Sequence, residues 1–125
     1  MVTNMDDSLA FYCKGLGFSI ANQWEPEGKI EWCWLQLGGA CIMLQEYREN
    51  PRVEKPGEGV SIYFICEDAL SVYKPIISNG LIASEPFVGN NMWVVGLNDP
   101  DGYKIFFESP TEVEEGRLYS EVDSW

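Results

Sequence analysis

Residues 4–18 decide the fold, and they read NMDDSLAFYCKGLGF. Apolar side chains recur in this stretch at helical spacing, at Leu9, Phe11, Tyr12 and Leu16. Asp6 or Asp7 can cap the start of a helix, and the glycines near the end of the stretch can stop it. The pattern therefore predicts a helix over Asp6–Gly15, followed by a strand over Phe18–Trp24.

A hairpin follows this helix and strand. Gly38-Gly39 joins two β-rich runs, Ile30–Leu37 and Ala40–Tyr47, and two glycines favour a two-residue turn. The predicted pairs are Leu37 with Ala40, Trp34 with Met43, and Trp32 with Gln45. One face is then wholly apolar: Cys33, Leu35, Leu37, Ala40, Ile42 and Leu44. The other face is aromatic with polar groups: Trp32, Trp34, Gln36, Cys41, Met43 and Gln45. The second face suits a cleft wall, but aromatic residues and Met suit a core or a subunit interface equally well.

The second half of the chain has the same kinds of element. A polar linker is expected over Arg48–Glu58, and the elements after it are a strand over Gly59–Cys66, a helix over Asp68–Asn79, an irregular strand over Leu81–Val88, and two paired strands over Asn91–Asn98 and Tyr103–Ser109. A four-residue loop between the last two strands would pair Val95 with Phe106 and Trp93 with Glu108. That register places Trp93, Phe106 and Glu108 on one face of the sheet.

The order of elements indicates an internal repeat. Asp7, Leu9 and Tyr12 match Asp68, Leu70 and Tyr73 at one constant offset. The sequence therefore predicts an α+β fold of two βαβββ modules. The first strand of the first module is largely missing, because only residues 1–4 precede the helix.

Composition narrows the classes of function. The net charge is −12, from 20 acidic and 8 basic side chains, and such a surface repels nucleic acid and anionic membranes. There is no signal peptide or apolar run long enough to span a membrane, so we expect a soluble, cytoplasmic protein. The chain has 4 cysteines and no histidine, and none of the cysteines form a Cys-x-x-Cys pair. We interpret them as inert thiols in a reducing compartment.

Two motifs carry a resemblance to a known family. The stretch Asn4–Tyr12 followed by Gly15–Phe18 resembles the opening motif of the glyoxalase/bleomycin-resistance/dioxygenase (vicinal-oxygen-chelate) superfamily, and Asp99–Ile105 resembles its closing hairpin. The resemblance implies a single domain, with modules at about 1–47 and 59–109, an acidic tail over 110–125, and each module curling its sheet into part of a mixed-sheet cup. It also implies a homodimer.

The same resemblance gives a negative result for metals. The positions where metal-dependent members of the superfamily carry ligands fall on Met43, Ser61 and Phe106, and the first ligand would precede Met1. None of these three side chains suits a hard or borderline divalent ion. We therefore expect no metal and no cofactor.

The resemblance also implies a cup lined mostly by aromatic side chains: Trp32, Trp34, Met43, Ser61, Tyr63, Trp93, Phe106 and Glu108. Such a surface is typical of a small-molecule site. We expect metal-independent binding of the bleomycin-resistance type, sequestering a planar ligand, with cationic compounds as the first class to test. Two alternatives remain open. One is a lyase or isomerase that uses Glu108 or an N-terminal segment not present here, and the other is a dimeric interaction module without a ligand.

Overall fold

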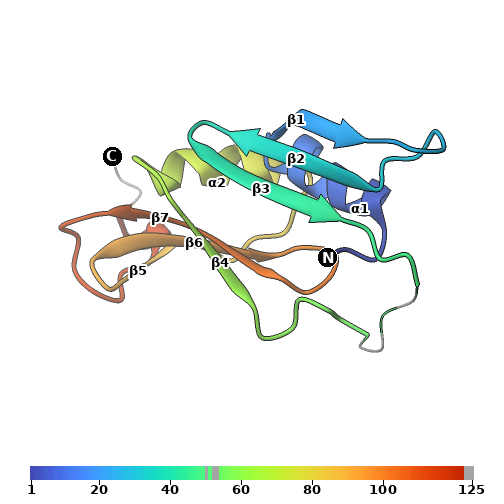
Figure 1. The fold of residues 1–125 in the computed structure, drawn as a ribbon. Coiled ribbons are helices and arrows are strands. Elements are labelled where there is room, and N and C mark those ends of the chain that lie inside the picture. The colour runs from blue at the N-terminus through green and yellow to red at the C-terminus, as the bar shows by residue number, and fades with distance from the viewer. Residues whose placement is uncertain (50, 52–53, 123–125) are drawn as a thin grey trace. The chain divides into compact units, whose positions relative to one another are not determined.

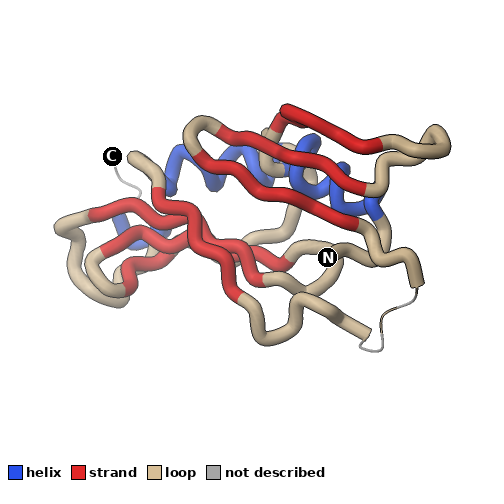
Figure 2. Tube along the Cα trace, in the orientation of Figure 1, coloured by secondary structure: helices blue, strands red, loops and turns tan. Residues whose placement is uncertain are grey.

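The computed structural model describes residues 1–49, 51 and 54–122, and it is a mixed α and β structure with two open sheets (Figures 1 and 2). In chain order the elements are α1 (Met5–Leu9), the π-helical turn η1 (Ala10–Gly15), β1 (Ser19–Trp24), β2 (Trp32–Leu37), β3 (Ala40–Gln45), β4 (Ser61–Ile65), α2 (Ala69–Ser78), β5 (Phe87–Gly89), β6 (Met92–Asn98), β7 (Lys104–Pro110) and α3 (Tyr119–Val122). The predicted α+β class is confirmed. Part of the predicted linker, residues 50, 52 and 53, and the end of the predicted tail, residues 123–125, lie outside this description.

Contacts divide the chain into two units. The first unit comprises residues 1–58 and the loop Asp99–Tyr103, and the second comprises residues 59–98 and the chain from Lys104 onward. In the second unit, a helix is followed by three antiparallel strands, and β4 pairs in parallel with the last of them. The first unit repeats this connectivity, with Val2 alone bridging in parallel to Glu46 where a full strand would lie.

The first helix differs from the prediction at its start. Asn4 caps it, and the side-chain oxygen of Asn4 accepts a hydrogen bond from the backbone N–H of Asp7 at 3.0 Å. The helix therefore begins before Asp6, and neither Asp6 nor Asp7 is the cap. Asn4 has the role that Asp68 has in α2, so the predicted correspondence of Asp7 with Asp68 is wrong. After Leu9 the turns widen to π-helical geometry, which the apolar spacing does not reveal.

The first sheet has the order β1-β2-β3, and its hairpin register is the predicted one. Leu37 pairs with Ala40, and Trp34 pairs with Met43. The apolar face packs into the core of the unit. Its most deeply buried side chains are Cys33, Leu35 and Leu44, and Met5, Phe11 and Tyr12 of the helical segment are buried as well.

The loop Asp99–Tyr103 is held in the first unit by buried acids. The carboxylate of Asp99 accepts hydrogen bonds from the Tyr12 hydroxyl at 2.7 Å and from the backbone N–H groups of Asp101 and Tyr103. The carboxylate of Asp101 accepts hydrogen bonds from the backbone and hydroxyl of Thr3. Burial raises the pKa of Asp99, and these hydrogen bonds only partly oppose that shift. The acids have their partners within the unit, so they fix the loop in place.

The second sheet has the order β4-β7-β6-β5, and α2 packs on β6 and β7. The helix has nearly the predicted bounds, because Asp68 caps its start and Asn79 ends it. Pro75 lies within the last turns of the helix, which continues to Ser78. The predicted irregular strand over Leu81–Val88 is wrong for its first part, since pairing begins only at Phe87.

The register of β6 and β7 differs from the prediction by one residue. Trp93 pairs with Ser109 and Gly96 pairs with Phe106, because the loop has five residues, from Asp99 to Tyr103. A shift of one residue moves side chains to the opposite face. Trp93 therefore lies with the buried side chains, 4% exposed, and its ring meets that of Tyr119 edge-on at 6.4 Å between centroids. The expectation that Trp93 lines the open face with Phe106 and Glu108 is wrong.

The acidic tail is part of the second unit as far as it is described. The backbone N–H of Val88 donates to the carbonyl of Arg117, and the N–H of Gly116 donates to the carbonyl of Val88. The tail thereby extends the sheet past β5, and α3 follows with Tyr119 at its start. No helix among the described residues is long and apolar enough to cross a membrane.

Candidate functional site

The open face of the second sheet collects several of the predicted site residues. The register places Ser61 beside Lys104, Tyr63 beside Phe106, and Ile65 beside Glu108. Ser61, Tyr63, Phe106 and Glu108 therefore share one face, as predicted. The rings of Tyr63 and Phe106 stack at 4.9 Å between centroids with an interplanar angle of 15°. Tyr63 is 56% exposed, so one ring of this pair faces solvent.

A groove lies beside this aromatic pair in the second unit, with a volume of about 310 Å³. Its floor contains Gly96 and Phe106, and Leu97, whose side chain lies on the buried face, lines it between them. Its other lining residues are Ile82 and Ser84, from the segment before β5, and Asn98 and Lys104, from the ends of β6 and β7. The groove thus has an apolar floor with one basic side chain among its lining residues.

Gly96 shapes the floor of the groove. A side chain at this position would place its Cβ 2.9 Å from a ring carbon of Phe106. The missing side chain therefore lets the Phe106 ring lie close against the backbone of β6. The backbone N–H of Ser84 donates to the carbonyl of Gly96 at 3.2 Å, which ties the segment before β5 to the same point.

The first sheet also has an exposed aromatic face. Trp34 and Met43 are cross-strand partners and are 41% and 64% exposed. Trp32 lies on the same face and is half-buried. Cys41 on this face is exposed. This is the predicted aromatic face of the first sheet.

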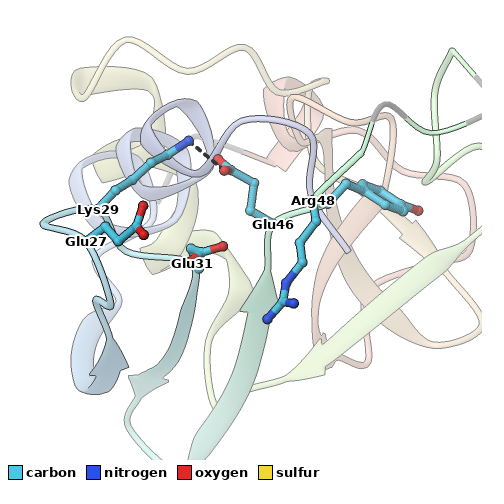
Figure 3. Close-up of a pocket in the computed structure, with 6 residues that line it drawn as sticks. Glu27, Lys29, Glu31, Glu46 and Arg48 are labelled. Atoms are coloured by element: carbon cyan, nitrogen blue, oxygen red, sulfur yellow. Dashed lines mark hydrogen bonds and ion pairs between the residues drawn. The ribbon is translucent and has the colours of Figure 1, made fainter.

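A second groove in the first unit is lined by charged side chains and has a volume of about 410 Å³ (Figure 3). Its lining residues are Glu27, Lys29, Glu31, Glu46, Tyr47 and Arg48. The Lys29 ammonium contacts the Glu46 carboxylate at 2.6 Å, and the Arg48 side chain points away from that pair (Figure 3). The other Glu46 oxygen accepts a hydrogen bond from the backbone N–H of Met5 at 2.7 Å. Glu46 therefore ties the sheet to the start of α1.

Electrostatics support a structural role for Glu46. Burial opposes its ionisation, but the hydrogen bonds from Lys29 and from the Met5 N–H, together with the Lys29 charge, outweigh burial and lower the pKa of Glu46. The hydrogen bond to Glu46 in turn raises the pKa of Lys29. Both groups are held in their charged forms, so the pair is unsuited to proton transfer near neutral pH.

The thiols and acids offer little reactive chemistry. Burial raises the pKa of Cys33 to about 11, and burial also raises the pKa values of Cys13 and Cys66. These three thiols are therefore poor nucleophiles. Within the described ranges, no group of three or more Cys, Asp or Glu side chains is placed to hold a metal ion.

The sequence did not identify the groove beside Phe106. Ile82 is 90% exposed, and the sequence pattern does not predict that this apolar side chain lies on the surface. Lys104 lies two residues before Phe106 in β7, so alternation along the strand could have placed it on the open face. The error in the β6–β7 register hid this arrangement, because it put Trp93 on that face instead.

Solved structures with this fold include a resistance determinant and an antibiotic binding protein. A bleomycin resistance determinant encoded on the transposon Tn5 aligns with a TM-score of 0.69 and 22% identity, over 88% of this chain and 91% of that chain. TnmS3, an antibiotic binding protein from Streptomyces sp. CB03234, aligns with a TM-score of 0.68 and 18% identity, over 88% and 89%. TioX from Micromonospora sp. ML1 aligns with a TM-score of 0.68 and 16% identity, over 90% and 93%.

At these identities the likeness shows the fold alone. No curated protein matches the chain by sequence. A family model, in contrast, matches residues 1–107, which include α1, η1, α2 and every strand except the end of β7. On that match, the chain belongs to the Glyoxalase/Bleomycin resistance protein/Dioxygenase superfamily.

Proposed function

We propose that this chain binds a planar small molecule on the exposed aromatic faces of its sheets and sequesters it without a metal ion. The observation that carries the proposal is the solvent-facing stack of Tyr63 on Phe106 beside a groove. Exposed aromatic and apolar side chains gathered on one sheet face mark an interaction surface. Trp34 and Met43 give the first sheet a comparable surface.

The chemistry of these faces favours flat ligands. Aromatic rings stack on one another, and a stacked pair contributes about 0.5–1.5 kcal/mol beyond the burial of area. The family includes a bleomycin resistance determinant and an antibiotic binding protein among its solved structures, and this kinship supports a ligand of the same general kind. The predicted metal-ligand positions carry Met43, Ser61 and Phe106, so the proposal involves no metal chemistry.

The proposal also covers the charge of the ligand, the location of the protein and its oligomeric state. The net charge of −12 would raise the local concentration of cations around the chain, so cationic planar compounds are the first class to test. We propose a cytoplasmic location and a homodimer, the latter because exposed apolar sheet faces also suit a contact with a second copy. Sedimentation that shows a monomer at micromolar concentration would contradict the dimer.

Calorimetric titration tests the binding function. We expect bleomycin or another cationic aromatic compound to bind the wild-type chain with a dissociation constant below millimolar. Tyr63→Ala should weaken this binding roughly 3- to 12-fold, the equivalent of losing one stacked ring. Ile77→Ala is the matched control, because Ile77 is an exposed apolar residue on α2.

The outcomes separate the aromatic-face proposal from its alternatives. Equal binding by Tyr63→Ala and the wild type would exclude the second sheet, and Trp34→Ala would then test the first sheet in the same way. If no planar compound binds, the exposed faces are better explained as contacts between copies of the chain.

A further inference from the structure

The open face of β7 alternates between charged and aromatic side chains. Lys104, Phe106 and Glu108 occupy successive positions on this face. Lys104 lines the groove beside Phe106, whereas Glu108 does not. Of the two charged side chains on this face of β7, Lys104 therefore lines the groove.

Lys104 has no charged partner within the part of the chain that the structure describes. The ion pairs found there involve Lys29 and Arg117 as the basic residues. The nearest cross-strand partners of Lys104 are Asn98 and Ser61, which are polar and uncharged. Its ammonium is thus available to a ligand in the groove, and the Asn98 side chain lines the same end.

The size of the groove limits the ligand. Its volume of about 310 Å³ lies at the lower end of the range for small-molecule pockets, roughly 300–1,000 Å³. Phe106 and Ile82 supply the apolar contacts, and the Phe106 ring lies against Gly96. A flat molecule of about two fused rings fits this combination of size and surface.

The charge of a side chain that contacts the ligand affects binding more than the net charge of the whole chain does. At physiological ionic strength, charges on the surface are screened beyond about 8 Å. The acidic surface as a whole therefore affects the approach of a ligand, while the side chain that touches the ligand decides which group is preferred. In this groove the charged side chain among the lining residues is Lys104.

We propose that the groove of the second unit binds a planar aromatic molecule that carries an anionic group, such as a carboxylate or a phenolate. The ring lies on Phe106, and the anionic group contacts Lys104 and Asn98. This inference rests on the proposed small-molecule function and gives it a ligand class. It also names a binding residue, Lys104, that the aromatic pattern does not include.

Three probes with one ring system separate charge from stacking. They are naphthalene carboxylate, the neutral naphthalene carboxamide, and naphthylmethylammonium. The measurement is a titration of the ¹⁵N-labelled chain, followed by the amide shifts of Gly96, Leu97 and Phe106. We expect the carboxylate to bind roughly 3- to 5-fold more tightly than the carboxamide, as for a partly exposed ion pair.

A pair of lysine variants tests whether Lys104 contacts the anionic group of the ligand. Lys104→Gln should remove the preference for the carboxylate, while Lys74→Gln, the same change of net charge on α2, should leave the preference in place. Adding salt should reduce the preference in the wild type and should have little effect in Lys104→Gln.

The possible results distinguish this inference from the function on which it rests. If all three probes bind at the groove with equal affinity, or if the cation binds most tightly, the anionic ligand class is wrong and small-molecule binding stands. If Lys104→Gln and Lys74→Gln behave alike, Lys104 is not the contact. If no probe shifts these amides at millimolar concentration, both proposals fail.

Discussion

At the scale of single residues, Gly96 is the position where a small change would alter the groove most directly. The Phe106 ring fills the space that a side chain at residue 96 would need. This close approach orients the ring, because Gly96 limits one edge of the ring and Tyr63 stacks on one of its faces. The shape of the groove therefore depends on the lack of a Cβ at Gly96 as well as on the side chains that line the groove.

Gly96→Ala should accordingly disturb both stability and binding. The added Cβ would lie 2.9 Å from the ring, so the ring or the strand must shift, and the expected cost is about 1 kcal/mol. Urea unfolding measures this cost. Gly39→Ala is the control, because a Cβ at residue 39 meets open space. Equal stability of the two variants would mean that Phe106 is not held against Gly96.

Glu46 gives a pH-dependent prediction at the same scale. Its pKa is lowered in the folded chain from an ordinary value of 4.5, so its stabilising effect is present above that pH and is lost as pH falls through the folded value. Glu46→Gln should therefore be less stable than the wild type by about 1–2 kcal/mol at pH 7, since it loses charge-assisted hydrogen bonds. The gap should close as the pH falls below 4.5 and through the lowered folded-state pKa of Glu46.

Thermal unfolding of Glu46→Gln and the wild type across this pH range is the measurement. Asp99 titrates in the opposite sense, but it is common to both chains and cancels in their difference. Glu27→Gln, in the same groove, serves as the control. A stability gap that stays constant from pH 7 to acid would show that the Glu46 carboxylate is not the stabilising group.

At the scale of elements, the two hairpins show what the sequence can and cannot determine. The register of β2 and β3 followed from Gly38-Gly39, because a two-residue turn fixes the pairing. The β6–β7 loop offered no such constraint. In the structure Asp99 closes a five-residue loop by accepting hydrogen bonds from the backbone of Asp101 and Tyr103, and this closure depends on a side-chain conformation that a residue count does not contain.

The helices likewise differ in how well the neighbouring sequence predicts their first residue. Asp68 was predictable as the start of α2, because it directly precedes the apolar pattern. For the first helix, two aspartates suggested a later start, while Asn4 made the cap. Most of the candidate site on β4 and β7 was predictable by alternation, but Trp93 was not, since its face depended on the loop.

Substitution at the two candidate caps separates these interpretations of the first helix. Asn4→Ala should lower the free energy of unfolding by about 1 kcal/mol, because it leaves the backbone N–H of Asp7 without its acceptor. Asp6→Ala should have a smaller effect, since Asp6 lies in the first turn, where its charge interacts favourably with the helix dipole but caps no backbone N–H. Chemical denaturation of both variants is the measurement, and the reverse order would restore Asp6 as the cap.

At the scale of the whole molecule, family membership and ligand chemistry are separate questions. The opening and closing motifs identified the superfamily from sequence, and the family match over residues 1–107 confirms it. One fold hosts many chemistries, so function must come from the site. The site proposed here is a set of exposed aromatic side chains on open sheet faces, with a lysine at the end of a small groove.

Binding on the open face of the second sheet is tested by mapping amide shifts over the whole ¹⁵N-labelled chain during titration with planar aromatic compounds. We expect saturable shifts that cluster on β4, β6 and β7 around Tyr63, Gly96 and Phe106, for at least one compound at submillimolar concentration. Shifts that cluster instead around Trp93 and Tyr119, on the buried side of the same sheet, would contradict it, as would no saturable shift for any compound.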